Sequence, residues 1–319
     1  MDKTKKLGKH KKASKKSFGV FVLLAGLFFL LIAGVLAESI FSNSDAVNKN
    51  DEILKPNAVK IKDYSSSTSS SLLKPITYPI KYQAATPKPT PEQVYTGFCL
   101  NVPVLTYHHI QPQATAVSLK QTSLNVDNGM FDQQIGYLAS KGYTPISALA
   151  LVNALRTHTQ LAGKSIVITM DDGYADNDTY ALPVLKKYNF NANLMLATGL
   201  VGSSPDMLSW SQVLDMKNSG LIYFTNHTWS HYSIANGPQS KIESEIDTAA
   251  TQIKQYAGQD TNIFTYPYGT FNNNAIQTLQ KKGYIGGFST IPGHYQCDSF
   301  IMTLHRTRIG NTPLSNYGL

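Results

Sequence analysis

Cysteine is scarce in this chain, and charged side chains are few outside one short segment. Two cysteines among 319 residues exclude a disulfide-rich scaffold and a four-cysteine zinc site, so a bound metal would need His and carboxylate ligands. The net charge of +8 arises almost wholly from residues 1–17, which hold eight lysines and one aspartate, whereas the rest carries 20 basic and 19 acidic side chains. This nearly neutral remainder offers no basic stripe for phosphates, and nucleic acid is therefore not expected as a partner.

A long apolar run follows the lysine-rich start. Residues 18–37 read FGVFVLLAGLFFLLIAGVLA, and as a helix they would span about 30 Å at roughly 1.5 Å per residue, enough to cross a bilayer. The lysines predict a cytoplasmic tail over residues 1–17 and an extracytoplasmic location for everything after the run. We expect a retained anchor because the run exceeds the roughly 7 to 15 residues of a signal-peptide core, although cleavage near Ala37 would instead give a secreted protein.

The next segment has the composition of a stalk. Residues 38–97 include SSSTSSS at 65–71 and TPKPTP at 86–91. Such serine-rich and proline-alternating sequences favour extended chain over a packed core. We therefore expect a stalk over residues 38–97 and a folded domain over residues 98–319.

In the folded part, short apolar runs alternate with segments of helical period, as in β/α units around a parallel sheet. Helices are expected over residues 130–141 and 241–257, each followed by a glycine. Seven strands are expected, over residues 102–107, 165–170, 192–197, 221–226, 262–266, 285–289 and 300–304. One βα domain of this size predicts an α/β barrel with its active site where the strands end.

The two cysteines stand just before the first and the last expected strand. In a closed barrel these strands would be neighbours, so a bond between Cys99 and Cys297 is geometrically possible in an oxidising compartment. Two unpaired thiols fit the sequence equally well.

Two adjacent carboxylates end the second expected strand, in Asp171-Asp172-Gly173. Such a pair repels itself unless a cation or proton lies between the two groups, or unless the side chains diverge into different roles. Taken alone, the segment could equally be an ordinary turn.

Two histidines follow the fourth expected strand. His227 and His231 would face the same side if the chain between them made one helical turn, and with a carboxylate they would form the three-ligand set of an open metal site. An isolated pair with this spacing more often lies on the surface and binds no metal. The position of this pair directly after a strand favours a role as metal ligands.

Two further strand ends carry polar residues. Pro267-Tyr268-Gly269 follows the fifth expected strand, where the turn could point a backbone N–H at a developing oxyanion or serve only as a rigid turn. His108 and His109 follow the first expected strand directly, and we expect one of them to be structural.

In this order, the Asp-Asp-Gly, paired-His and Pro-Tyr-Gly motifs resemble those of the polysaccharide deacetylases with a NodB homology domain, the family 4 carbohydrate esterases. The resemblance covers about residues 101–309. It implies a distorted (β/α)7 barrel and a divalent metal that assists hydrolysis of N-acetyl groups on a glycan. By position, it implies that Asp171 is the catalytic base and that the backbone N–H of Tyr268 binds the oxyanion. The implied metal ligands are Asp172, His227 and His231.

The end of the first expected strand is similar to that of the branch acting on exported poly-N-acetylglucosamine, in which a His at this place serves as general acid. This points to His108, with His305 as the rival. Many members carry an Arg before the Pro-Tyr-Gly turn that orients the base, where this chain has Thr265 and Tyr266. Arg306 is the candidate replacement, and a surface position for it is the alternative.

The predicted activity is metal-dependent removal of N-acetyl groups from N-acetylglucosamine in poly-N-acetylglucosamine or peptidoglycan. The alternatives are O-deacetylation of an acetylated xylan and glycan binding without turnover. The implied His and Asp donors suit zinc, and cobalt, nickel or manganese could occupy the same site. A polysaccharide and the membrane, through residues 18–37, are the expected partners, and no obligate protein partner is inferred.

Overall fold

A computed structural model describes residues 95–319 of the chain. The predicted tail, the predicted anchor and nearly all of the predicted stalk lie outside the described residues. Within residues 95–319, no helix combines the length and the hydropathy that a membrane crossing requires.

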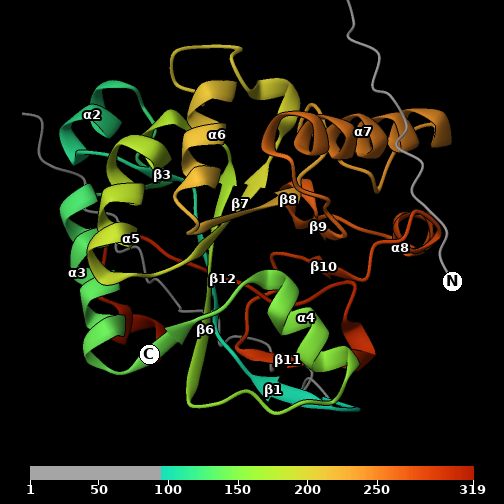
Figure 1. Ribbon diagram of the computed structural model, residues 1–319, viewed down its shortest axis with the longest axis horizontal. Coiled ribbons are helices and arrows are strands. Elements are labelled where there is room, and N and C mark those ends of the chain that lie inside the picture. The colour runs from blue at the N-terminus through green and yellow to red at the C-terminus, as the bar shows by residue number, and fades with distance from the viewer. Residues whose placement is uncertain (1–94) are drawn as a thin grey trace, which may run out of the picture. The chain divides into compact units, whose positions relative to one another are not determined.

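Seven parallel strands of an eight-stranded curved sheet follow the order β10-β9-β8-β7-β6-β2-β12 (Figure 1), and the eighth, β5, pairs in parallel with the beginning of β6. Their bounds are β2 Val104–Tyr107, β6 Lys164–Asp172, β7 Ala192–Leu196, β8 Ile222–Asn226, β9 Ile263–Thr265, β10 Gly286–Phe288 and β12 Thr307–Arg308. The smaller strands are β1 Cys99–Asn101, β3 His109–Ile110, β4 Asn125–Val126, β5 Tyr143–Pro145 and β11 Tyr295–Cys297. This arrangement matches the predicted distorted barrel, because consecutive β/α units place their strands side by side.

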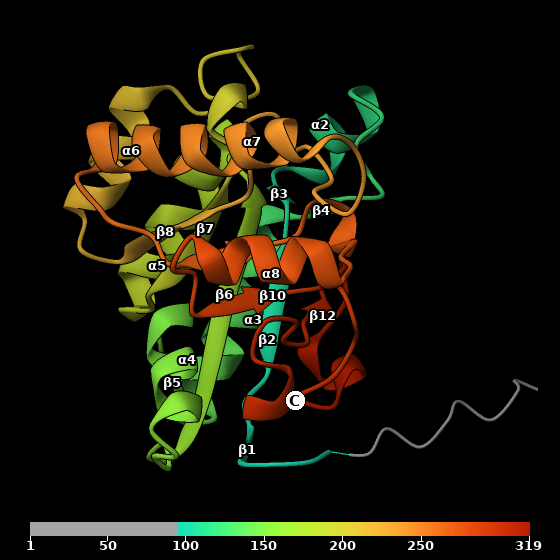
Figure 2. The ribbon, with the colours of Figure 1, turned by 90° about the vertical axis from the view of Figure 1, so that its right-hand side faces the viewer.

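Helices surround the sheet (Figures 1 and 2). They are α2 Gln113–Ser118, α3 Asn128–Ser140, α4 Ala148–Arg156, α5 Leu182–Tyr188, α6 Trp210–Asn218, α7 Gln239–Gln252 and α8 Asn273–Lys281. The two expected helices are confirmed as α3 and as α7, which a π-helical turn, η3 Ile253–Ala257, continues. On α7, the buried Ile242, Ile246 and Ala249 recur at spacings of four and three, so the apolar stripe faces the core.

The predicted seventh strand, over residues 300–304, is wrong. Phe300 ends a 3-10 turn, η5 Asp298–Phe300, and within this stretch only Leu304 makes a β-bridge, to Phe288 of β10. The chain then continues to β12, which pairs with β2 at the other end of the sheet. A buried irregular segment and a strand carry the same apolar residues, so composition did not separate them.

The disulfide that the sequence left open is present, between Cys99 and Cys297. These residues are register partners in the antiparallel pair of β1 and β11. Because β1 leads directly into β2, the bond joins the beginning of the folded domain to its last segments.

Candidate active site

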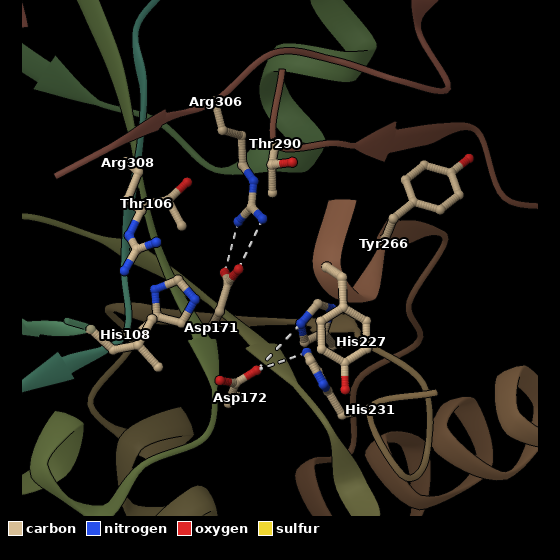
Figure 3. A pocket seen from close by; sticks show the side chains of 12 residues that line it. Thr106, His108, Asp171, Asp172, His227, His231, Tyr266, Thr290, Arg306 and Arg308 are labelled. Atoms are coloured by element: carbon tan, nitrogen blue, oxygen red, sulfur yellow. Dashed lines mark hydrogen bonds and ion pairs between the residues drawn. The ribbon is translucent and has the colours of Figure 1, made fainter. Parts of the chain in front are cut away.

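One cavity of about 540 Å³ opens at the carboxyl-terminal ends of the strands, where a βα barrel builds its active site. Figure 3 shows side chains converging on it from the ends of β2, β6 and β8 and from the segment that leads into β12. All the predicted site residues line it, namely His108, Asp171, Asp172, His227, His231 and Tyr268. The cavity thus collects side chains that are far apart in the sequence.

Arg306 binds Asp171 with both ends of its guanidinium. Nη1 lies 2.7 Å from Oδ1 and Nη2 lies 2.8 Å from Oδ2, and both side chains are buried. Burial would raise the pKa of Asp171, but the Arg306 charge and its hydrogen bonds hold that pKa below the usual value. Arg306 also donates to the Ser289 carbonyl and to the Thr169 hydroxyl. It is therefore not a surface residue, and it occupies the position suggested for the missing arginine.

Asp172 reaches the same cavity although it neighbours Asp171 on one strand, where adjacent side chains point to opposite faces. It is the last residue of β6 and has a left-handed backbone, with φ of 74°, which takes its side chain out of the strand alternation. Gly173 follows with φ of 97°, and a Cβ at this position would lie 2.6 Å from Leu196 Cδ1. The Asp-Asp-Gly segment is thus a strained strand end and not an ordinary turn.

The chain from His227 to His231 does not form the expected helical turn. It is a loop in which Thr228 and His231 have φ of 65° and 56°. Asn226 Oδ1 accepts from the Thr228 backbone N–H at 2.8 Å, and the Thr228 hydroxyl accepts from the Tyr232 N–H at 2.8 Å. These side-chain bonds replace those of a helix, and they bring the two imidazoles to 4.8 Å between ring centroids.

Asp172, His227 and His231 form a cluster that suits a divalent cation. Asp172 Oδ1 lies 3.4 Å from His227 Nε2 and 3.3 Å from His231 Nε2, and one ligand atom from each residue lies within 4.8 Å of the others. Asp172 Oδ1 is buried without a hydrogen-bond partner. His227 Nδ1 donates to the Thr265 carbonyl at 2.8 Å, so Nε2 is the ring nitrogen that faces Asp172 and could bind a metal.

The charges in this cluster also suit a metal. Burial and the neighbouring His227 lower the pKa of His231, so its ring is kept in the neutral form that ligates. Burial would raise the pKa of Asp172, but His227 and His231 outweigh it and lower that pKa. The residues present therefore fit an ion held by one carboxylate and two imidazoles.

The first strand end separates its two histidines as alternation predicts. His108 lines the cavity, and its pKa is lowered by burial, an effect that the Asp171 and Asp172 carboxylates oppose. His109 is buried, with Nδ1 2.6 Å from Asp176 Oδ2. The rival acid, His305, is not among the residues that line this cavity, and its ring stacks on Phe300.

Tyr268 stands at the cavity rim, with 68% of its surface exposed and its ring 4.5 Å from that of His231. Its φ is 60°. The role predicted for its backbone N–H stays a prediction. Seven non-glycine residues in the described part of the chain have positive φ, and four of them belong to this site or its loops: Asp172, Thr228, His231 and Tyr268. Left-handed backbone of this kind collects at functional sites.

Sequence reasoning missed Arg308, which lines the cavity together with Arg306. Residues two apart on a strand share a face. The spacing of Arg306 and Arg308 could therefore have indicated a shared face. It was not used because the last strand was predicted over residues 300–304 and not at β12.

Part of the chain matches a known protein family. Residues 158–286 match the family model described as Polysaccharide deacetylase. The poly-beta-1,6-N-acetyl-D-glucosamine N-deacetylase of Escherichia coli (strain K12) is 25% identical over 250 residues, and the match covers 66% of this chain but only 36% of that relative.

Solved structures also resemble the domain. The Streptococcus pyogenes deacetylase PplD, in complex with acetate, is 28% identical with a TM-score of 0.62, and the match covers 68% of this chain and 96% of PplD. IcaB from Ammonifex degensii is 25% identical with a TM-score of 0.58, over 67% of this chain and 93% of IcaB.

Proposed function

Because this chain contains a polysaccharide deacetylase domain, we propose that it removes N-acetyl groups from N-acetylglucosamine residues of a polysaccharide outside the cytoplasmic membrane. One observation carries the proposal. A single cavity holds the arginine-bound carboxylate of Asp171 beside the convergent ligand atoms of Asp172, His227 and His231. Hydrolysis of an unreactive amide requires a base next to a Lewis-acid site, and this cavity has residues for both.

We assign Asp172, His227 and His231 as ligands of a divalent ion. When bound, such an ion lowers the pKa of a water molecule and polarises the acyl oxygen of the substrate. Zinc suits this donor set, and cobalt, nickel and manganese are the alternatives to be tested.

Two residues of the chain transfer protons in the proposed reaction, and a third stabilises the oxyanion. Asp171, kept ionised by Arg306, accepts a proton from the water that attacks the acetamide carbon. The Tyr268 backbone N–H donates a hydrogen bond to the oxyanion that forms. His108 donates a proton to the departing sugar amine as the C–N bond breaks, and acetate and the free amine leave.

With residues 18–37 as the predicted anchor, we propose that the reaction takes place on glycans outside the cell. Exported poly-N-acetylglucosamine and the N-acetylglucosamine of peptidoglycan both lie within reach of an anchored domain. The name of the Escherichia coli relative supports the first. Each turnover replaces a neutral acetamide with an amine that is largely protonated near neutral pH, so the product is a more cationic surface glycan.

An acetate-release assay on the purified chain tests the proposal. We expect acetate from N-acetylglucosamine oligomers, loss of this release after chelation, and its recovery with zinc or cobalt. An O-acetylated xylan oligomer serves as the comparison substrate. Release from the xylan alone would support the esterase alternative, and no release from either substrate with any metal restored would contradict the proposal.

The adjacent aspartates provide a matched pair of variants for the metal assignment. Asp172→Asn removes a ligand charge, and we expect the affinity for zinc or cobalt to fall at least about tenfold. Asp171→Asn removes the base and leaves the three ligands, so metal binding should survive while acetate release is lost. Isothermal titration with each metal measures the difference, and equal metal affinities for the two variants would refute the assignment.

A further inference from the structure

We propose that Asp176 and Asn177 are positioning residues for His108. These two side chains, here called the Asp176–Asn177 clasp, bind the chain segment that follows β2 and orient the His108 ring toward the cavity. The inference rests on the proposed function, because it concerns the general acid of that reaction.

The clasp bonds to each of three consecutive residues. Asn177 Nδ2 donates to the His108 carbonyl at 2.9 Å and to Asp176 Oδ1 at 2.9 Å. Asp176 Oδ1 also accepts from the Ile110 backbone N–H at 3.2 Å, while Asp176 Oδ2 lies 2.6 Å from His109 Nδ1. Asn177 is 0% exposed and the side chains of His109 and Asp176 are 4% and 11% exposed, so water competes little for these bonds.

His108 needs such support because it lies between two strands. β2 ends at Tyr107 and β3 begins at His109, so no strand of the sheet includes His108. The His109 ring is fixed by Asp176 and stacks on Tyr174 with 3.6 Å between ring centroids. Fixing His109 on that side directs His108 to the opposite side, because neighbouring residues of an extended chain alternate.

The clasp also joins the predicted acid to the predicted base. Asp176 and Asn177 follow Asp171 in the helical segment after β6, and β6 pairs with β2 up to the register partners Tyr107 and Met170. One bonded unit therefore carries Asp171 and holds the His108 backbone. A shift of about 1 Å between two such groups is enough to slow a reaction by about 100-fold.

Fold stability alone does not account for Asn177. Its Oδ1 is buried without a hydrogen-bond partner, which is unfavourable for folding. Asn177 also begins a π-helical turn, η1 Asn177–Ala181, and such turns are frequent at functional sites. Both features fit a residue placed for its Nδ2 bond to the His108 carbonyl.

The experiment compares substrates that do and do not need an acid. Release of a sugar amine requires a proton, whereas 4-nitrophenolate leaves 4-nitrophenyl acetate without one. We expect Asn177→Ala to lower kcat for N-acetylglucosamine oligomers about 10- to 100-fold with little change in KM. Hydrolysis of the aryl ester should stay within about threefold of wild type, and His108→Ala should show the same contrast.

A double variant tests whether Asn177 affects the rate by positioning His108. This test uses only the oligomers, so it does not require the enzyme to hydrolyse the ester. If the clasp acts through His108, then His108→Ala combined with Asn177→Ala should be no slower on the oligomers than His108→Ala alone. Additive losses would overturn the proposal, as would an equal loss on amide and ester or an unchanged kcat.

Asn193→Ala is the matched control. Asn193 is 1% exposed, binds the Ala148 N–H and the Ile168 carbonyl at 2.9 and 3.0 Å, and does not line the cavity. This control should lower Tm without changing the amide-to-ester ratio. If Asn177→Ala does not fold, Asp176→Asn and Asn177→Ser carry the same comparisons. Lack of acetate release by the wild-type chain would refute the proposed function, whereas an active wild type with additive variants would refute only the clasp.

Discussion

At the scale of single residues, the site depends on a carboxylate that stays ionised in a buried position. Arg306 binds the Asp171 carboxylate through two short hydrogen bonds. These bonds favour the ionised form of Asp171 although the side chain is buried. The resemblance to the family predicts Asp171 as the base, and Arg306 was the candidate partner with a surface position as the alternative. The structure shows Arg306 bound to Asp171.

Arg306→Gln is expected to raise the pKa of Asp171, because burial then acts without the opposing charge. The proposed base accepts a proton only when it is ionised, so the acid limb of kcat/KM should move to higher pH, and kcat/KM near neutral pH should fall about 100-fold. A pH–rate profile measures this change. Arg308→Gln, which removes a cavity arginine that is not bonded to Asp171, should leave the acid limb in place, and an unmoved acid limb in Arg306→Gln would contradict the argument.

At the scale of elements, the positions of the proposed metal ligands depend on how the strands end. The alternation of a strand would place Asp171 and Asp172 on opposite faces, and only the left-handed backbone of Asp172 and the space beside Gly173 allow both to reach the cavity. The His227–His231 loop shows the same dependence, because side-chain bonds from Asn226 and Thr228 replaced the helical turn that the spacing suggested.

Gly173→Ala tests this dependence. The φ of 97° and the 2.6 Å approach to Leu196 Cδ1 predict a loss of about 1–3 kcal/mol in the free energy of unfolding, together with weaker metal binding. Gly163→Ala is the control, since its φ is 63° but no atom lies within 4 Å of the added Cβ. It should lower stability by about 1 kcal/mol and leave metal binding unchanged. Urea unfolding and metal titration check both variants, and equal effects would argue against a role for the close contact.

At the scale of the whole folded domain, the barrel depends on its final segments. Leu304 bridges to β10 and β12 pairs with β2, so the last part of the chain joins both ends of the strand order. The Cys99–Cys297 bond then fixes the first strand of the domain, β1, to β11, across a sequence separation of 198 residues.

Replacing both cysteines with serine is expected to lower the free energy of unfolding by about 2–5 kcal/mol, because the unfolded chain regains the freedom that the cross-link removes. The disulfide lies outside the cavity, so kcat/KM of the folded variant should match that of wild type. Urea unfolding with and without dithiothreitol measures the effect. A reductant effect of equal size in the serine variant would show that another process is responsible.

Local sequence patterns were enough to predict an α/β barrel and the residues of a candidate hydrolytic site. Apolar periodicity depends on neighbours within a few residues, so it located six of the seven barrel strands and two of the helices. The order of the Asp-Asp-Gly, paired-His and Pro-Tyr-Gly motifs indicated a deacetylase. Which polar groups meet depends on the folding of distant segments, because the contact of Arg306 with Asp171 joins residues 135 apart in the sequence. The same holds for the left-handed backbone of Asp172 and for the pairing of β12 with β2. The local sequence allows several conformations at these places, and packing against distant segments selects one of them.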